Sequence, residues 1–179
     1  MLLGIVRSEG GDHAGAIQFY ERARELNPAH IHVLANLGAA YRTAGRLSEA
    51  RMVLDEALRI DKRFAIARNT LGNVLLDMGD REGAKKEYER AVAAQPNYAE
   101  PIAGLARLAE EEHRLEDATR LAARALSIAP TNVSAQLTVG KVKLRTERAA
   151  EAAALFEGLV QLAGVSTTNR VVAEGHLGE

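Results

Sequence analysis

One pattern recurs five times along the 179-residue chain with an unbroken period of about 34 residues. A large aliphatic residue followed by a small one marks each copy, at Leu3-Gly4, Leu37-Gly38, Leu71-Gly72, Leu105-Ala106 and Val139-Gly140. A further small residue recurs in step, at Ala16, Ala50, Ala84, Ala118 and Ala152. Repetition at this period is typical of stacked helical units, each of which buries its apolar face against its neighbours. The sequence therefore predicts an all-α chain that acts by binding rather than by catalysis.

Each copy is predicted to hold two short helices. In the copy from residue 31 to residue 64, apolar residues recur at helical spacing from Ile31 to Ala44, and Gly45 then interrupts the pattern. A second helix is predicted from Leu47 to about Ile60. Because the connection is so short, the two helices run antiparallel and cross closely, which requires small residues at the crossing. The predicted unit is a helical hairpin.

The same copy carries the residues of a known repeat. The run from Ala35 to Tyr41, followed by Gly45 and by Glu49-Ala50, resembles the tetratricopeptide repeat, a family with this period. The resemblance covers essentially the whole chain. It implies an α-solenoid of stacked antiparallel hairpins that winds into a right-handed superhelix. It also implies a concave groove, lined by the first helix of each pair, in which family members mostly bind peptides or partner proteins.

The chain is expected to form a single array over residues 1–179. Its repeats are approximately 1–30 (truncated), 31–64, 65–98, 99–132 and 133–166, with the start of a sixth, truncated repeat at 167–179. Both ends fall inside a hairpin, so we expect the chain to be a fragment of a longer protein. Val171, Val172 and Leu177 would then lack a second helix to pack against, so this segment is expected either to dock in an unusual way or to mediate end-to-end self-association.

One turn departs from the repeat. His113 stands where the other copies carry Gly11, Gly45 and Gly79 between the two helices. Glycine adopts a left-handed backbone without strain, whereas histidine does so at a cost. We therefore expect this turn to adopt an adjusted geometry.

Composition narrows the function. The formal net charge of −1 gives no basic face for nucleic acid or an anionic membrane, so neither is an expected partner. Without cysteine the chain has no disulfide or thiolate site. No phosphate-binding or nucleophile motif occurs, so no cofactor and no enzymatic activity are expected. The compartment is undetermined, with the cytoplasm favoured over the periplasm, and the bias to arginine and alanine indicates a bacterial source.

Two clusters are interpreted as structural. His30 and His32 alternate like a metal pair, but no third ligand lies near them in the sequence. Glu110-Glu111-Glu112 stands beside Arg107 and Arg114 at helical spacing and is interpreted as a solvated, partly salt-bridged helix face. No metal site is therefore predicted.

The groove implied by the resemblance has a polar lining of mixed charge. Its candidate residues are His32, Asn36, Arg42, Ile66, Asn69, Asn73, Asp77, Arg107, Glu111, Lys141 and Arg145. Asparagine donates and accepts hydrogen bonds, which suits the backbone of an extended peptide. The alternative is that asparagine is merely tolerated on a solvated face. Some family members grip acidic chaperone tails with a cationic clamp, but the matching positions here carry no cation, so that mode is not expected.

Three functions remain open from the sequence. The first is a protein-interaction scaffold that binds a peptide or partner protein in the groove. In this case Asn69→Ala with Asn73→Ala is expected to weaken binding and to leave the melting temperature unchanged. The second is a substrate-docking arm of a larger bacterial transferase, a sulfotransferase or glycosyltransferase. The third is a homo-oligomeric assembly scaffold.

Overall fold

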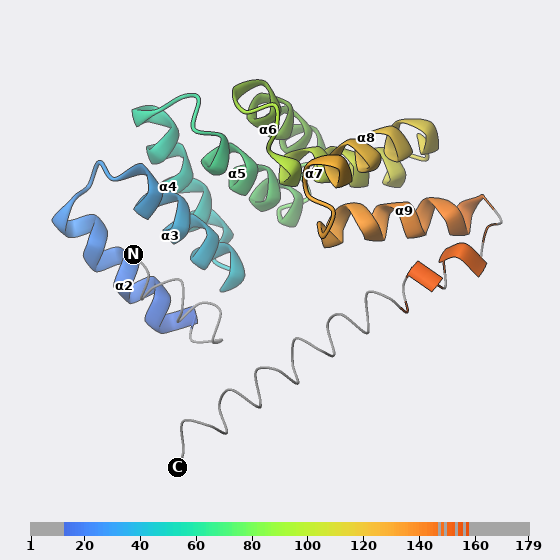
Figure 1. Ribbon diagram of the computed structural model, residues 1–179. Coiled ribbons are helices and arrows are strands. Elements are labelled where there is room, and N and C mark those ends of the chain that lie inside the picture. The colour runs from blue at the N-terminus through green and yellow to red at the C-terminus, as the bar shows by residue number, and fades with distance from the viewer. Residues whose placement is uncertain (1–12, 147, 149, 153, 156, 158–179) are drawn as a thin grey trace, which may run out of the picture. The chain divides into compact units, whose positions relative to one another are not determined.

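The computed structural model describes residues 13–146 together with residues 148, 150–152, 154, 155 and 157 (Figure 1). Helices follow one another along this part of the chain. They are α2 (His13–Leu26), α3 (Ile31–Thr43), α4 (Leu47–Ile60), α5 (Ala65–Asp77), α6 (Arg81–Ala94), α7 (Ala99–Glu111), α8 (Leu115–Ile128) and α9 (Val133–Arg145). The hairpin predicted for residues 31–64 is confirmed by α3 and α4, whose bounds follow the expected helices closely.

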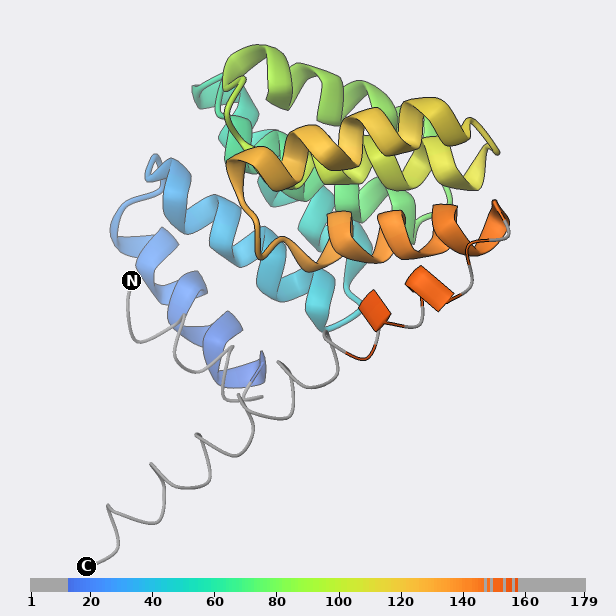
Figure 2. The same cartoon turned by 45° about the vertical axis from the view of Figure 1, so that its right-hand side comes forward.

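The described part of the chain divides into two compact units between Leu105 and Ala106, inside α7. Within the first unit, α3 packs against α4 and α5 against α6 (Figures 1 and 2). In the second unit, α8 packs against α9. That residues 1–179 form one continuous array stays a prediction, and Val171, Val172 and Leu177 lie outside the described residues.

Small residues in the first helices face large residues of the second helices, as the repeat pattern predicts. A Cβ atom placed on Gly38 would come within 2.6 Å of the Leu54 Cγ atom. Tyr88 has no exposed surface and lies between two glycines: a Cβ on Gly72 would come within 2.5 Å of its ring, and a Cβ on Gly104 within 2.8 Å. These close approaches fix the distance between neighbouring helices.

In the second unit, a smaller core forms around Ala109, Ala118 and Val142, with Leu115 and Leu121 packed against it. The alanines at 109 and 118 are fully buried, so these helices approach each other closely as well. Ala118 is a small residue of the repeat pattern and lies in this core, whereas Ala109 stands where other copies carry Tyr41 and Leu75.

The turns between paired helices share one backbone geometry. In the first, the amide of Arg46 donates to the carbonyl of Tyr41 at 2.8 Å and the amide of Gly45 donates to that of Arg42 at 3.0 Å. This pair of hydrogen bonds closes the helix end and requires a left-handed residue, here Gly45 with φ 74°. The same two hydrogen bonds close α5, where Gly79 has φ 86°.

His113 takes the glycine position without a change of turn. Its φ is 61°, its amide donates to Glu110 at 3.0 Å, and the amide of Arg114 donates to Ala109 at 2.8 Å. The expectation that this turn would adjust is therefore wrong. The two hydrogen bonds hold the histidine backbone in a conformation that glycine adopts without strain.

His113→Gly is expected to raise the free energy of unfolding by about 0.5 kcal/mol, because relief of left-handed strain slightly exceeds the added entropy of the unfolded chain. Gly79→Ala introduces the same strain into an unstrained turn and is expected to lower it by about 1 kcal/mol. Urea unfolding followed by circular dichroism measures both. Changes of the same sign in the two variants would contradict the shared geometry.

Candidate binding surface on the first helices

In the first unit, the predicted groove residues lie on α3 and α5, which pack side by side. On α5, Ile66, Asn69, Asn73 and Asp77 recur every three or four residues and so share one helix face. Their exposure differs: Ile66 and Asp77 are exposed, Asn73 is half-buried, and Asn69 is only 8% exposed. The surface offered by α5 is therefore mainly its two ends and Asn73.

Charged and aromatic contacts join α3 to its neighbours at both ends of this surface. Arg42 Nε on α3 donates to Asp77 Oδ2 on α5 at 2.6 Å, and both side chains are partly exposed. At the other end, the exposed His32 ring meets Phe64 edge to face, with ring centroids 4.9 Å apart. An exposed ion pair contributes at most about 1 kcal/mol. Arg42 and Asp77 already satisfy each other, so a ligand charge would have to compete for them.

The asparagines differ in how many of their hydrogen-bonding groups are still free to bind a ligand. Tyr88 donates its hydroxyl hydrogen to Asn73 Oδ1 at 2.6 Å, and the Asn69 amide lies 3.4 Å from the Tyr98 hydroxyl. Burial raises the pKa of Tyr98, and the charge of Glu100 raises it further. Asn36 is half-buried and, within the described chain, has no hydrogen-bond partner. The Tyr88 hydroxyl therefore fixes the Asn73 oxygen, and both amide hydrogens of Asn73 stay available to a ligand.

In the second unit, the predicted residues surround a buried carboxylate. Glu110 on α7 is only 2% exposed and accepts a hydrogen bond from Arg145 Nε on α9 at 2.6 Å, while Lys141 Nζ lies 3.9 Å away. His113 Nδ1 lies 3.3 Å from Arg145 Nη1. Arg145 is thus committed to Glu110, whereas Lys141 lies at the edge of ion-pair distance and its side chain is half exposed.

The interpretation of the acidic run as a solvated face is wrong for its first member. Glu110 is buried and pairs with two cations of another helix, whereas Glu112 is exposed and pairs with Arg114 as expected. Glu111 is half-buried, and Arg107 is half-buried with no ion-pair partner among the residues described. Glu110 differs from its neighbours only in its contacts with α9, a helix that is distant in the sequence. Residue spacing along α7 alone does not reveal these contacts.

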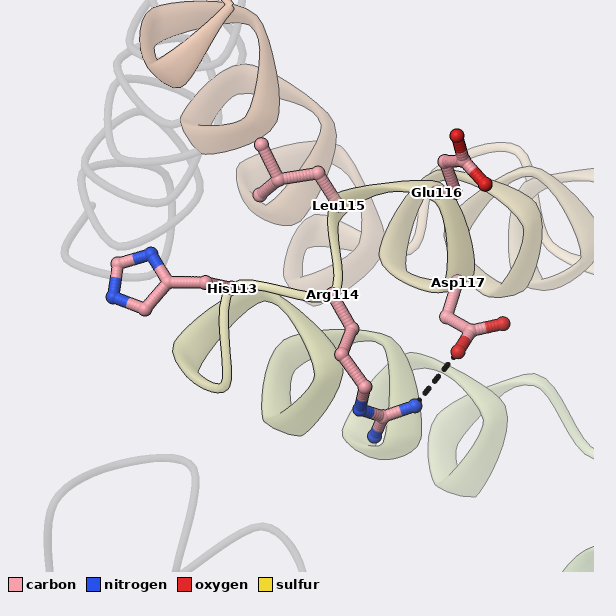
Figure 3. Close-up of a pocket in the computed structure, with 5 residues that line it drawn as sticks. All are labelled: His113, Arg114, Leu115, Glu116 and Asp117. Carbon is pink, nitrogen blue, oxygen red and sulfur yellow. Dashed lines mark hydrogen bonds and ion pairs between the residues drawn. The ribbon is translucent and has the colours of Figure 1, made fainter.

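A hollow of about 490 Å³ lies at the turn from α7 to α8 (Figure 3). Its lining is His113, Arg114, Leu115, Glu116 and Asp117. Arg114 and Asp117 point toward each other and form an ion pair at 2.8 Å, while His113 points away from them. Hydrogen bonds from Arg120 and Arg114 lower the pKa of Asp117. Arg114 and Asp117 neutralise each other, so the hollow offers a ligand little uncompensated charge.

A second hollow of about 460 Å³ lies among α2, α3 and α4, around Tyr41. The Tyr41 hydroxyl donates to Glu21 at 2.5 Å, and Arg24 pairs with Glu56 at 2.6 Å. Burial and then the hydrogen bond to Glu21 raise the pKa of Tyr41 to about 12. The hydroxyl therefore stays protonated at neutral pH and serves as a donor within the hairpins.

The histidine pair contributes to packing. The rings of His30 and His32 lie edge to face, with centroids 6.0 Å apart, and His32 also contacts Phe64. Over the described ranges, no three histidine, aspartate or glutamate side chains gather in a way that could hold a metal ion. In the same part of the chain, no helix has the length and apolar character needed to cross a membrane.

A family model described as "Tetratricopeptide repeat" matches residues 9–71 and 41–108. The chain belongs to the tetratricopeptide repeat family. Its repeat period and its helical hairpins are those of this family.

One relative is the "Heat-shock protein cognate (HSC) co-chaperone sgt12" of Aspergillus fumigatus, 32% identical over 98 residues. The match covers 51% of this chain and 29% of that protein. Among solved structures, the tetratricopeptide repeat protein TTC0263 of Thermus thermophilus matches with a TM-score of 0.83 at 19% identity, over 99% of this chain and 96% of that one.

MamA matches with a TM-score of 0.67 at 22% identity, over 94% of this chain and 98% of that one. At such identities these two structures show the fold alone. They confirm the predicted fold class, an α-solenoid of stacked antiparallel hairpins.

Proposed function

We propose that this tetratricopeptide repeat chain is a protein-interaction scaffold that binds an extended peptide segment of a partner on the first-helix surface of α3 and α5. Membership of the family and the similarity to a co-chaperone support the scaffold role. The chain is proposed to act by binding and not by catalysis.

One observation carries the proposal for the surface. The buried Tyr88 hydroxyl holds Asn73 Oδ1 at 2.6 Å, so the Asn73 amide is oriented before any ligand arrives and both its hydrogens are available. A fixed donor binds a peptide carbonyl with less loss of side-chain entropy than a mobile one. Asn36 on the neighbouring α3 supplies a second uncommitted amide.

The hydrogen bond between Tyr88 and Asn73 also decides which substitution tests the proposal. Asn73→Ala would remove the acceptor of a buried hydroxyl and so destabilise the fold, which would obscure an effect on binding. The expectation that Asn69→Ala with Asn73→Ala leaves melting unchanged does not fit this geometry, because Asn69 is buried as well. Asn73→Asp is cleaner, since it keeps an acceptor for Tyr88 and removes both donors.

Peptides selected from a random library on the intact chain are expected to bind Asn73→Asp at least tenfold more weakly, because a donor is lost and a negative charge faces the peptide carbonyl. Fluorescence anisotropy measures the affinity. Asn97→Asp makes the same chemical change at an exposed loop position and is expected to leave the affinity within twofold. Undiminished binding by Asn73→Asp, or the absence of any selected peptide, would remove this surface from consideration.

A further inference from the structure

A hollow of about 300 Å³ in the first unit has a lining in which cations predominate. Its residues are Lys62, Arg63, Arg68, Arg90, Ala93 and Ala94. They come from the turn after α4, from α5 and from the end of α6. We name these six residues the basic hollow.

The basic hollow lies on a different side of α5 from the proposed peptide surface. A helix turns about 100° per residue, which places Arg68 about 160° around α5 from the common direction of Ile66, Asn73 and Asp77. A ligand bound in the hollow would not compete with a peptide on α3 and α5, so a role for the hollow goes beyond the proposed function.

Comparison between the repeats shows what is unusual at this position. Arg68 stands one repeat after Leu34 and one repeat before Ile102, which are both fully buried. Glu87 stands one repeat after Val53, which is also buried, and one repeat before Leu121, which packs on the core of the second unit. Where its neighbours carry apolar residues, this repeat thus carries two charged ones.

Arg68 and Glu87 form an ion pair at these two positions. Arg68 Nη1 lies 2.7 Å from Glu87 Oε2, and the two side chains are 15% and 10% exposed. A buried ion pair is generally no more stable than well-packed apolar residues of similar volume. Folding stability therefore does not account for the exchange.

Two further exchanges form the hollow itself. Lys62 stands where three other repeats carry Pro28, Pro96 and Pro130. Ala94 stands where the neighbouring repeats carry Ile60 and Ile128. The first exchange adds a cation, and the second removes the side-chain volume that would fill the space beside it.

Four cations line the basic hollow, and two carboxylates lie beside it: Glu87, and Asp61, which accepts a hydrogen bond from the Arg63 amide at 2.8 Å. Glu87 pairs with both Arg68 and Arg90. Among the described residues, no other carboxylate lies within ion-pair distance of the side chains that line the hollow. The side chains of Lys62 and Arg63 have no ion-pair partner among the described residues. Arg68 Nε also donates to the Lys62 carbonyl at 2.8 Å, which holds its guanidinium in place.

We propose that the basic hollow binds a phosphoryl group. Arginine offers a rigid fork of donors that matches phosphate oxygens, and lysine adds a compact point charge. The phosphoryl group could belong to a phosphorylated segment of a partner protein or to a free phosphate compound. Its chemistry is the same in both cases, and the experiment distinguishes the two sources.

Inorganic phosphate titrated into the full chain at constant ionic strength is expected to bind saturably, as measured by calorimetry or by amide shifts of the residues around Lys62. Lys62→Gln with Arg63→Gln removes two exposed charges without touching the Arg68–Glu87 pair, and is expected to weaken phosphate binding at least tenfold. Lys85→Gln with Lys86→Gln makes the same change in net charge on α6, outside the hollow, and is expected to keep the affinity within twofold. Circular dichroism confirms that both variants are folded.

A short peptide that contains phosphoserine, its unphosphorylated form and glycerol phosphate complete the experiment. Tighter binding of the phosphoserine peptide than of inorganic phosphate supports a phosphorylated partner, and equal binding of all phosphate compounds supports a free one. No saturable phosphate binding, or equal affinities of the wild type and the Lys62→Gln, Arg63→Gln variant, would overturn the proposal.

Discussion

Tyr88→Ala is expected to lower the free energy of unfolding by about 4 kcal/mol, the largest effect of any single substitution proposed here. Tyr88 has no exposed surface, and its ring fills the space between Gly72 and Gly104 so closely that neither position has room for a Cβ atom. Truncation would leave a cavity that two glycines cannot fill. It would also leave Asn73 Oδ1 without its donor.

Two control variants separate the parts of this loss. Tyr88→Phe keeps the ring and removes only the hydroxyl, so about 1 kcal/mol is expected. Met52→Ala on α4 removes a side chain of similar length that is 67% exposed, and is expected to cost less than about 0.5 kcal/mol. Urea unfolding followed by circular dichroism measures all three. A loss of about 1 kcal/mol for both Tyr88 variants would mean that the ring is not the spacer between these helices.

The position of Tyr88 shows why so much of this fold could be predicted from the sequence. The constant repeat spacing places the small residues of the first helices at equivalent positions, and likewise the large residues Tyr20, Leu54 and Tyr88 of the second helices, whereas α8 carries Ala122 at that position. In a repeat protein, equivalent positions make equivalent core contacts, so one local pattern accounts for many of them. The helix bounds of α3 and α4 and the glycine turns at Gly45 and Gly79 follow from the same pattern.

The contacts of individual polar residues could not be predicted in this way. Spacing makes Asn73 a groove candidate, but its hydrogen bond to Tyr88 joins positions 15 residues apart on different helices. The Arg68–Glu87 pair differs from the repeat pattern, and only a comparison of equivalent positions reveals it. Period and helical spacing describe which face a residue lies on, whereas its partners depend on distances between helices. The groove residues therefore stay a prediction beyond their placement on first helices.

His113 marks a different limit of the sequence pattern. Local propensity favours glycine at a left-handed position, so an adjusted turn is the simpler expectation. The structure keeps the turn because two backbone hydrogen bonds and the packing of the helices on either side outweigh a strain of about 1 kcal/mol. The hydrogen bonds of the turn and the packing of the helices around it decide the backbone conformation here, and the residue type at position 113 alone does not predict it.

Arg145→Ala is expected to lower the free energy of unfolding by about 3 kcal/mol, the second largest effect. Glu110 is 2% exposed, and Arg145 Nε at 2.6 Å is its closest cation, with Lys141 Nζ at 3.9 Å. Removal of Arg145 leaves a buried carboxylate with one distant partner, which costs more than the loss of an exposed pair. Urea unfolding monitored by circular dichroism measures the change.

The same carboxylate supplies the decisive control for this prediction. Glu110→Gln in the Arg145→Ala background removes the buried charge, so the double variant is expected to regain at least about 1 kcal/mol over Arg145→Ala alone. Arg148→Ala breaks an ion pair with Glu151 in which both side chains are about half exposed, and is expected to cost less than about 0.5 kcal/mol. If Arg145→Ala cost no more than Arg148→Ala, Glu110 would have to be solvated after all, and the interpretation of the acidic run as an open helix face would be restored. A double variant less stable than Arg145→Ala would instead show that Glu110 stabilises α7 through Lys141 alone.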